Sequence, residues 1–364
     1  MEPKTFPESV KKERLVLARE SRGMLQSELA KITDISQAKI SKMESGILEV
    51  SEENLEKIAE KLEYPESFFF EFSEVYPLGL HYFRKHKSIP GRQLKAIEAY
   101  VNLRRGEIEK LLRSVEFGTD RKIPHCDIED EKYNNSPEAI ANSVRKYWKI
   151  PRGPIDNMTD LLESAGILVI PCDFGTREFS GVGTWTREGV SLIFINKTMP
   201  GDRMRFTLAH ELGHIIMHRL ETETSEKEAD RFASEFLMPA EDIRHQLFGL
   251  TLDKAAQLKL NWKVSMASII MKGQTLEIDN NYSYLWIQMS KLGYRLNEPI
   301  EYSVPQEKPT LFGEMVSTHL NELGFTAKEL ARMFTIHEDE LRSLYNIKRS
   351  KQKDSTQKLR LISA

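Results

Sequence analysis

The sequence is short of cysteine, of long apolar runs and of an N-terminal signal, and each shortage excludes a class of protein. Two cysteines in 364 residues, Cys126 and Cys172, can form neither a disulfide framework nor a four-cysteine metal site. They fit a reducing compartment and are most simply explained as small core residues. No apolar stretch approaches the roughly 20 residues that cross a bilayer, and the polar N-terminus lacks the features of a secretory signal. We therefore expect a cytoplasmic protein without a membrane partner.

An excess of charge of one sign is also lacking. The chain has 52 Lys and Arg residues and 55 Asp and Glu residues, a formal net charge of -3, so any nucleic-acid-binding surface must be local. Hydrophobic residues make up 40% and charged residues 29%, which is typical of folded globular proteins. The length predicts two to four domains.

The first seventy residues are predicted to form short helices separated by polar turns. Residues 26–32 and 37–44 form two of these helices, and the turn between them ends at Ser36, a plausible N-cap. This pattern predicts a helix-turn-helix unit. Polar side chains on the outer face of its second helix could reach base edges and phosphates in a major groove, and they are Gln37, Lys39, Ser41 and Lys42.

Residues 25–30, 36–46 and 55–62 together resemble the XRE/Cro family of DNA-binding domains. The resemblance implies binding to double-stranded operator DNA, usually as a homodimer on a near-palindromic site. It places Gln26 on the DNA backbone, and Gln37, Lys39 and Lys42 at bases or phosphates. Residues 1–50 carry nine basic and eight acidic side chains, so electrostatic attraction to DNA is weak without dimerisation or a further basic element. A protein-interaction role for the same fold is the alternative.

A basic segment follows this unit. Residues 84–113 contain nine Lys or Arg and three Glu residues, and Pro90-Gly91 is expected to open a helix there. Such a helix could be a solvated connector, a phosphate-facing surface or an interdomain contact. Residues 118–135 are polar and are predicted to be a linker.

The pentapeptide His210-Glu211-Leu212-Gly213-His214 is the most informative motif in the chain. Residues four apart share a helix face, so His210 and His214 can bind one Zn²⁺, and Glu211 can deprotonate a water molecule beside it. His218 lies about 12 Å along the helix axis from His210 and cannot share that ion. We expect it to be a polar residue at the helix end.

A catalytic zinc site needs a third protein ligand, and Glu223, Glu226 and Glu228 are the candidates in the next predicted helix. Helical spacing favours Glu226, which shares an inward, mainly apolar face with Asp230, whereas Glu228, Arg231 and Glu235 fall on the polar outside. A carboxylate on an apolar face is costly unless it is paired or binds a metal. Asp230 could then accept the free N–H of one histidine. An ion pair between Glu226 and a basic side chain is the competing interpretation.

Residues 205–218 and 226–239, supported by residues 161–167, 262–266 and 293–299, resemble the ImmA/IrrE metallopeptidase family over about residues 137–300. This resemblance implies a gluzincin-like site with two histidines and a glutamate on zinc. It also implies limited proteolysis of an XRE-type repressor that derepresses mobile-element or stress genes. The protein substrate would be this chain, a paralogous repressor or a toxin-antitoxin partner.

In this interpretation the zinc ion polarises the scissile carbonyl and the attacking water, and Glu211 moves the water proton to the leaving amine. The predicted strand at residues 191–196 is a candidate edge for an extended peptide substrate. Two other hypotheses are a non-proteolytic regulator whose zinc domain senses a ligand or binds a partner protein, and a purely structural zinc site.

We therefore predict a predominantly helical α+β protein. Its expected parts are an all-α helix-turn-helix domain (1–75), a basic helical connector and linker (76–135), a gluzincin-like mixed α/β zinc peptidase domain (136–300) and a helical C-terminal region with a polar tail (301–364).

Overall fold

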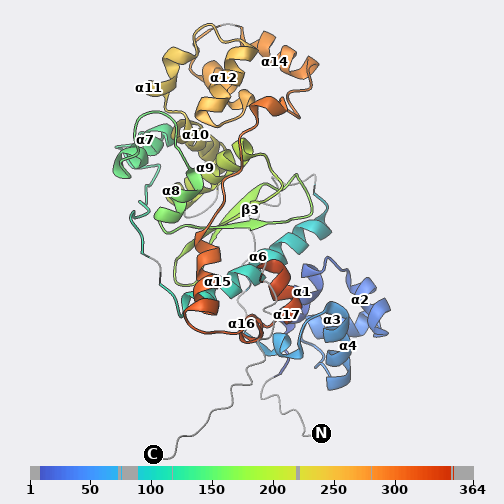
Figure 1. Ribbon diagram of the computed structural model, residues 1–364. Coiled ribbons are helices and arrows are strands. Elements are labelled where there is room, and N and C mark those ends of the chain that lie inside the picture. Colours follow the sequence, from blue (N-terminus) through green and yellow to red (C-terminus); the bar gives the residue numbers. More distant parts are fainter. Residues whose placement is uncertain are drawn as a thin grey trace, which may run out of the picture.

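The computed structural model describes residues 9–72, 75, 89–116, 118–218, 222–279, 281–345 and 347. Helices predominate around one small sheet, and the four N-terminal helices lie at the end of the molecule opposite α11–α14 (Figure 1). Within the described ranges no helix is long and apolar enough to span a membrane. Arg84, Lys85 and Lys87 of the predicted basic segment lie outside the described residues.

The order of elements confirms a predominantly helical α+β fold. The N-terminal helices are α1 (Lys12–Ser21), α2 (Gln26–Thr33), α3 (Gln37–Glu44), α4 (Glu52–Leu62) and η1 (Glu66–Phe70), followed by α6 (Gly91–Leu112). The central part contains α7 (Pro137–Tyr147), α8 (Met158–Ser164), β1 (Leu168–Cys172), β2 (Gly181–Trp185), β3 (Ser191–Asn196), α9 (Gly201–Met217) and α10 (Ser225–Leu237). The remaining elements are α11 (Ala240–Ile243), η2 (Arg244–Gln246), α12 (Leu252–Trp262), α13 (Met266–Thr275), α14 (Tyr282–Lys291), η3 (Ile300–Tyr302), α15 (Leu311–Asn321), α16 (Ala327–Phe334) and α17 (Glu338–Leu344).

The sheet has the strand order β1-β3-β2, with β3 parallel to β1 and antiparallel to β2. The expectation that residues 191–196 form a substrate-binding edge is wrong, because both sides of β3 are occupied by neighbouring strands. The apolar run Leu192–Ile195 is typical of a central strand, because such strands are buried on both faces. Strand β2 is an outer strand, and its glycines made it a weaker sequence signal.

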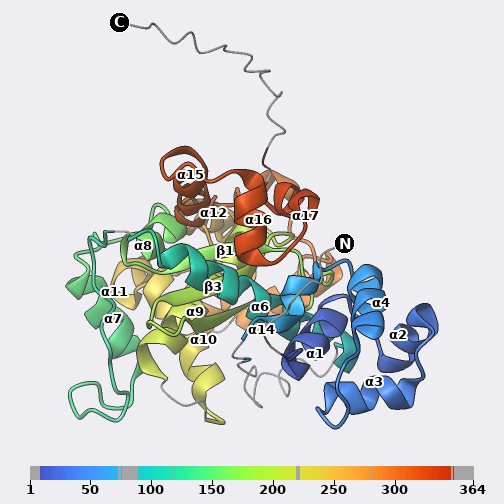
Figure 2. The ribbon, with the colours of Figure 1, turned by 90° about the horizontal axis from the view of Figure 1, so that it is seen from below.

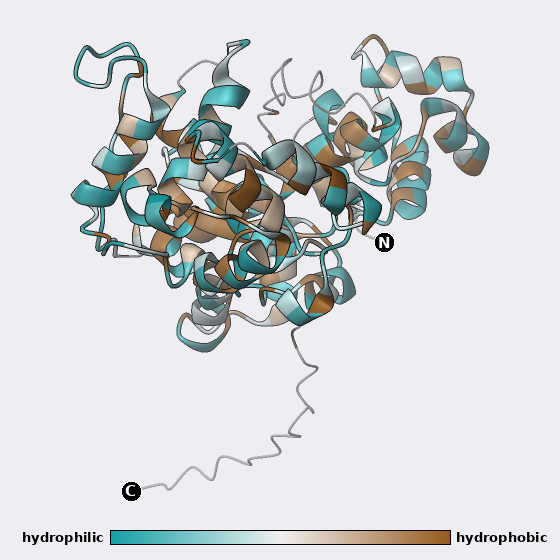
Figure 3. Cartoon of the chain, turned by 90° about the horizontal axis from the view of Figure 1, so that it is seen from above, coloured by the Kyte–Doolittle hydropathy of each residue, from teal (hydrophilic) through white to brown (hydrophobic). Residues whose placement is uncertain are grey.

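Two hydrophobic clusters lie on opposite faces of the sheet because successive strand residues point to opposite faces. Val169 and Ile193 belong to the cluster that contains α7–α10 and α12–α14. Ile170 and Phe194 belong to the cluster that contains α6, α15, α16 and the core of α1–α4. Figure 3 shows the hydrophobic residues gathered at the centre of the molecule and the hydrophilic ones on the outer helices. The N-terminal domain therefore shares its core with one face of the sheet.

Helix α6 connects the N-terminal domain to the sheet (Figure 2). Arg92 near its start bonds to Glu28 of α2, and Tyr100 in its middle contacts Phe174 just after β1. Arg104 and Arg105 are 6% and 3% exposed and pair with Glu107 and Glu109. The solvated-connector interpretation is therefore wrong for α6, and interdomain contact is the alternative that the structure supports.

Helices α16 and α17 repeat the backbone pattern of α2 and α3. Each pair begins with an eight-residue helix, and a left-handed residue follows it, Asp34 in one pair and Thr335 in the other. A buried isoleucine comes next, Ile35 or Ile336, and then the second helix. The first turn of α17 is acidic, however, and Glu340 pairs with Arg22 of the N-terminal domain. An acidic first turn disfavours contact with DNA phosphates. The second pair of helices instead packs against the N-terminal domain.

Candidate metal centre and DNA-reading helix

Helix α9 carries the central pentapeptide directly beneath the sheet. It begins after Pro200, and its buried residues pack against β2, β3 and α8. Four-residue spacing directs His210 and His214 to the same side of the helix, with ring centroids 4.8 Å apart. His210 is buried and Glu211 is 8% exposed, so both lie largely out of bulk water.

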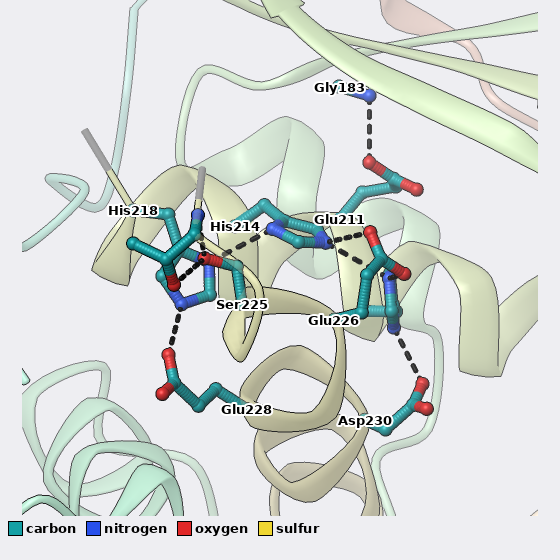
Figure 4. A network of polar contacts seen from close by, with 10 residues as sticks. Gly183, Glu211, His214, His218, Ser225, Glu226, Glu228 and Asp230 are labelled. Carbon is teal, nitrogen blue, oxygen red and sulfur yellow. Dashed lines mark hydrogen bonds and ion pairs between the residues drawn. The ribbon is translucent and has the colours of Figure 1, made fainter. Parts of the chain in front are cut away.

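Helix α10 approaches α9 closely because Gly213 has no side chain. A Cβ atom at Gly213 would lie 3.1 Å from the ring of Phe232 and 3.4 Å from the backbone of Ala229. This close approach brings Glu226, in the first turn of α10, opposite the two histidines (Figure 4). The glycine inside the motif is therefore required by helix packing.

Three ligand atoms from His210, His214 and Glu226 converge on one point. The two histidine Nε2 atoms lie 3.0 Å apart, and the Glu226 carboxylate oxygens lie 3.5 Å from His210 and 3.4 Å from His214. Ligands about 2 Å from a tetrahedral zinc ion are separated by roughly 3.3 Å, so these spacings suit that ion. All three ligand atoms lie within 4.8 Å of one another, the one such group in the described part of the chain.

Hydrogen bonds on the far side of each ring make this group a set of electron-pair donors. His210 Nδ1 lies 2.8 Å from Asp230 Oδ1, and in the tautomer where Nδ1–H donates to this carboxylate, Nε2 keeps a lone pair. His214 Nδ1 lies 2.9 Å from His218 Nδ1, and His218 Nε2 lies 2.9 Å from Glu228. Lone pairs and a carboxylate facing one point repel each other unless a cation lies between them. The donor set therefore fits a metal ion of the zinc type.

The geometry differs in three respects from the sequence expectations for α10. Asp230 is exposed, and not inward, yet it still reaches His210. Glu235 was expected outside but is 3% exposed and pairs with Lys272 of α13. Glu228 was also expected outside, but it bonds to His218, and together they support His214. The four-residue spacing of His214 and His218 could have predicted the contact between their rings. Nothing in the sequence indicated that Glu228 would bond to His218.

His218 lies where expected, at the end of α9. The helix stops at Met217, and the His218 backbone is extended, so its ring turns back toward His214. Burial and the neighbouring His214 lower the pKa of His218, although Glu228 opposes the shift. A neutral imidazole can relay a hydrogen bond between His214 and Glu228 in the way that carboxylate partners orient metal-binding histidines.

Glu211 projects from α9 toward the outer strand β2. Its Oε2 accepts a hydrogen bond of 2.8 Å from the backbone N–H of Gly183, and a Cβ at Gly183 would lie 3.2 Å from that oxygen. The glycine thus allows the carboxylate to lie against the strand edge, beside the converging ligands (Figure 4). One carboxylate oxygen is positioned by the strand, and the other can accept a proton.

The predicted DNA-contacting residues lie on α2 and α3. Gln37, Lys39, Ser41 and Lys42 are all exposed on α3, whose inner side buries Ile40 and Met43. Ser36 caps this helix through its hydroxyl, which accepts from the Lys39 N–H. Gln26 instead donates to Glu44 within the domain, 2.9 Å away. The α3 side chains form one outward face, whereas Gln26 joins α2 to the end of α3.

Comparison with protein families matches two parts of the chain. Residues 15–69 match the family model described as helix-turn-helix, and residues 162–272 match the model described as the IrrE N-terminal-like domain, a peptidase family. No curated protein matches the chain. The matched segments contain α2–α3 and the whole candidate metal centre. The chain thus contains an N-terminal segment similar to helix-turn-helix domains and, after it, a segment similar to the IrrE N-terminal-like peptidase domain.

Proposed function

We propose that this protein is a DNA-binding regulator whose second domain is a zinc-dependent endopeptidase that cleaves a repressor protein. The observation that carries the proposal is the convergence of His210, His214 and Glu226, with Glu211 held beside them by Gly183. The family match supports metallopeptidase activity in general. A repressor substrate goes beyond this match, and the helix-turn-helix domain on the same chain supports it. The substrate would be this chain, a paralogous XRE-type repressor or a toxin-antitoxin partner.

Zinc, when bound by these residues, supplies a Lewis acid that polarises a carbonyl group and acidifies water. Asp230 and the His218–Glu228 pair keep the two histidine rings oriented. Glu211 accepts the proton of the attacking water on its free oxygen and delivers it to the leaving amine. Its hydrogen bond to Gly183 fixes the carboxylate for both transfers. A structural zinc site needs no such base, so this arrangement favours catalysis.

Strand β2 replaces β3 as the proposed edge for an extended peptide. The residues that flank β2 bond to the β3 side: the Asn196 N–H donates to Ser180, and the Thr186 N–H donates to Val190. By alternation, the backbone N–H and C=O groups of the even-numbered β2 residues point toward β3. The backbone groups of Gly181 and Gly183 therefore face the other way, toward the candidate metal centre. A substrate that pairs with this edge would pass its backbone directly over Glu211.

Cleavage by matched zinc-loaded proteins tests the peptidase proposal. Wild type and Glu211→Gln are incubated with candidate repressors and alone, and the products are resolved by mass. We expect fragments from the wild type only, because the amide of Gln cannot accept the water proton. Intact proteins in both samples would contradict proteolysis and favour a sensor or partner-binding role.

Footprinting upstream of the protein's own gene tests the DNA proposal. Lys39→Ala with Lys42→Ala should lose protection, since both lysines lie on the exposed face of α3. Lys57→Ala with Lys61→Ala is the matched control on α4, where both lysines pair with glutamates of the same helix. Equal protection by the two double variants would show that α3 does not read DNA.

A further inference from the structure

A groove of about 750 Å³ lies at the start of α9. Its walls come from the beginning of α9, the start of α13 and the segment that follows α14. Phe206 and Tyr294 line it and are partly exposed, while Leu296 and Ile300 are 89% and 85% exposed. This is the outer, solvent-facing part of the domain, and its lining combines apolar surface with basic side chains.

The groove lies on the same face of α9 as the candidate metal ligands. Arg203, Phe206 and His210 are spaced at i, i+3 and i+7, so the two groove residues precede His210 along one side of the helix. Seven residues of helix span roughly 10 Å. An extended peptide covers that distance with about three residues.

Strand β2 and the residue before it run along this face from Arg203 to Glu211. Arg203 donates a hydrogen bond to Ser180, Gly181 lies against Thr207, and the Gly183 N–H donates to Glu211. A peptide paired with the outer edge of β2 and passing over Glu211 therefore continues toward Arg203 and enters the groove. The side chain about three residues from the scissile bond would lie there.

The groove has an uncompensated positive charge. Arg177, Arg203 and Arg295 line it and are exposed, and none of them forms an ion pair with the residues that the structure describes. Its two acidic residues, Asp202 and Glu298, share an ion pair with the buried Lys259, so the four basic residues of the lining outnumber the acidic ones by two. The basic groups are thus available to a ligand, and the acidic groups are not.

We propose that this groove is a specificity subsite for acidic side chains flanked by apolar ones, in a peptide bound along β2. Charge complementarity with the three arginines selects Asp or Glu, and Phe206, Leu296 and Ile300 provide the apolar contacts. The inference rests on the proposed peptidase function, since it concerns the substrate of the same site. It assigns the substrate class as an extended acidic–apolar segment of a protein.

Peptide binding to the full-length, zinc-loaded Glu211→Gln protein tests the subsite without requiring cleavage. The probes are fluorescent peptides of Ala, Leu and Val that carry a Glu-Asp pair, a Gln-Asn pair or a Lys-Lys pair, with anisotropy as the readout. We expect the Glu-Asp peptide to bind most tightly. Adding Arg203→Gln or Arg295→Gln should weaken its binding roughly fivefold, as expected for a partly exposed ion pair. Arg203→Glu with Arg295→Glu should instead prefer the Lys-Lys peptide.

Arg244→Gln, an exposed arginine on η2 outside the groove, is the control and should bind like its parent. Equal binding of the three peptides, no binding of any, or an unchanged preference in the charge-reversed variant would overturn the subsite. If the wild type cuts no protein but the acidic preference depends on the arginines, the peptidase proposal fails and the subsite stands. If the wild type cuts proteins without regard to acidic residues, the subsite alone fails.

Discussion

At the scale of single residues, the candidate metal centre depends on the partners that orient its histidines. Asp230 lies 2.8 Å from His210 Nδ1 and is exposed, so its removal should change little except that hydrogen bond. We expect Asp230→Ala to bind zinc about 10- to 100-fold more weakly, as is usual for the partners of metal-binding histidines. Competition with a fluorescent chelator measures the change.

Asp120→Ala is a suitable control, because Asp120 is an exposed loop residue distant from the metal centre in sequence. Equal zinc affinity in the Asp230 and Asp120 variants would mean that the hydrogen bond to His210 has no part in metal binding.

The two cysteines should be unreactive in the folded protein. Both are buried, and burial raises the pKa of the Cys172 thiol to about 12, so almost no thiolate exists at neutral pH. Cys126 accepts a hydrogen bond from Tyr133 inside the core. A thiol reagent should label neither cysteine until denaturant is added, and then both. Rapid labelling of the native protein would contradict this packing.

Single residues were predictable where helical spacing carries the information. The i, i+4 histidines and the choice of Glu226 over its neighbours follow from periodicity, and the structure brings these side chains together. Glu235 was misplaced because its stabilising partner, Lys272, lies 37 positions away in sequence. Contacts of that range leave no periodic signal on one helix.

At the scale of secondary structure elements, the site requires α9 and α10 to pack closely. Gly213→Val would force Phe232 and Ala229 away, because even a Cβ there lies 3.1 Å from the Phe232 ring. The variant should melt at a lower temperature and bind zinc more weakly, since Glu226 moves with α10. Calorimetry and zinc titration measure the two effects.

Gly106→Ala on α6 is the opposite case, because nothing lies within 4 Å of a Cβ there. It should stabilise the protein by about 0.5–1 kcal/mol through helix propensity. If both substitutions had the same sign, close packing at Gly213 would not explain that glycine.

The elements themselves were largely predictable, but their neighbours in the sheet were not. Residues 191–196 read as a strand, yet nothing in a buried apolar run says which strands flank it. The order β1-β3-β2 comes from long-range pairing, and it leaves β2, not β3, as the proposed peptide-binding edge. Strand propensity disfavours glycine. In β2, however, Gly183 lets the Glu211 carboxylate lie against the strand.

At the scale of the whole molecule, α6 and the C-terminal helices join the two matched domains. Tyr345 donates a 2.6 Å hydrogen bond to Glu107 and accepts one from Arg104, both buried on α6. Tyr345→Phe removes one partner of the buried carboxylate and should destabilise the protein by about 1–3 kcal/mol. Thermal unfolding measures this loss, and Tyr284→Phe, at a side chain that is 61% exposed, is the control. Matching melting temperatures would contradict a stabilising role for the junction.

The composition of the basic segment did not show this junction. Nine basic residues suggested a charged surface, but the five that lie on α6 all have partners. Arg92, Lys95 and Lys110 bond to other elements, and the two central arginines pair with glutamates of α6 itself. The partners on other elements depend on the tertiary fold and cannot be predicted from local charge. In the proposed function, the DNA contacts are therefore assigned to α3 and its neighbours and not to α6.

Zinc content tests the central claim, which is that His210, His214 and Glu226 form one metal centre. Purified wild type and Glu211→Gln should each hold one zinc ion after dialysis, because Glu211 is not a ligand. Glu226→Gln should lose most of it under the same conditions, since a neutral amide replaces the carboxylate ligand. The same zinc content in Glu226→Gln and wild type would contradict the account.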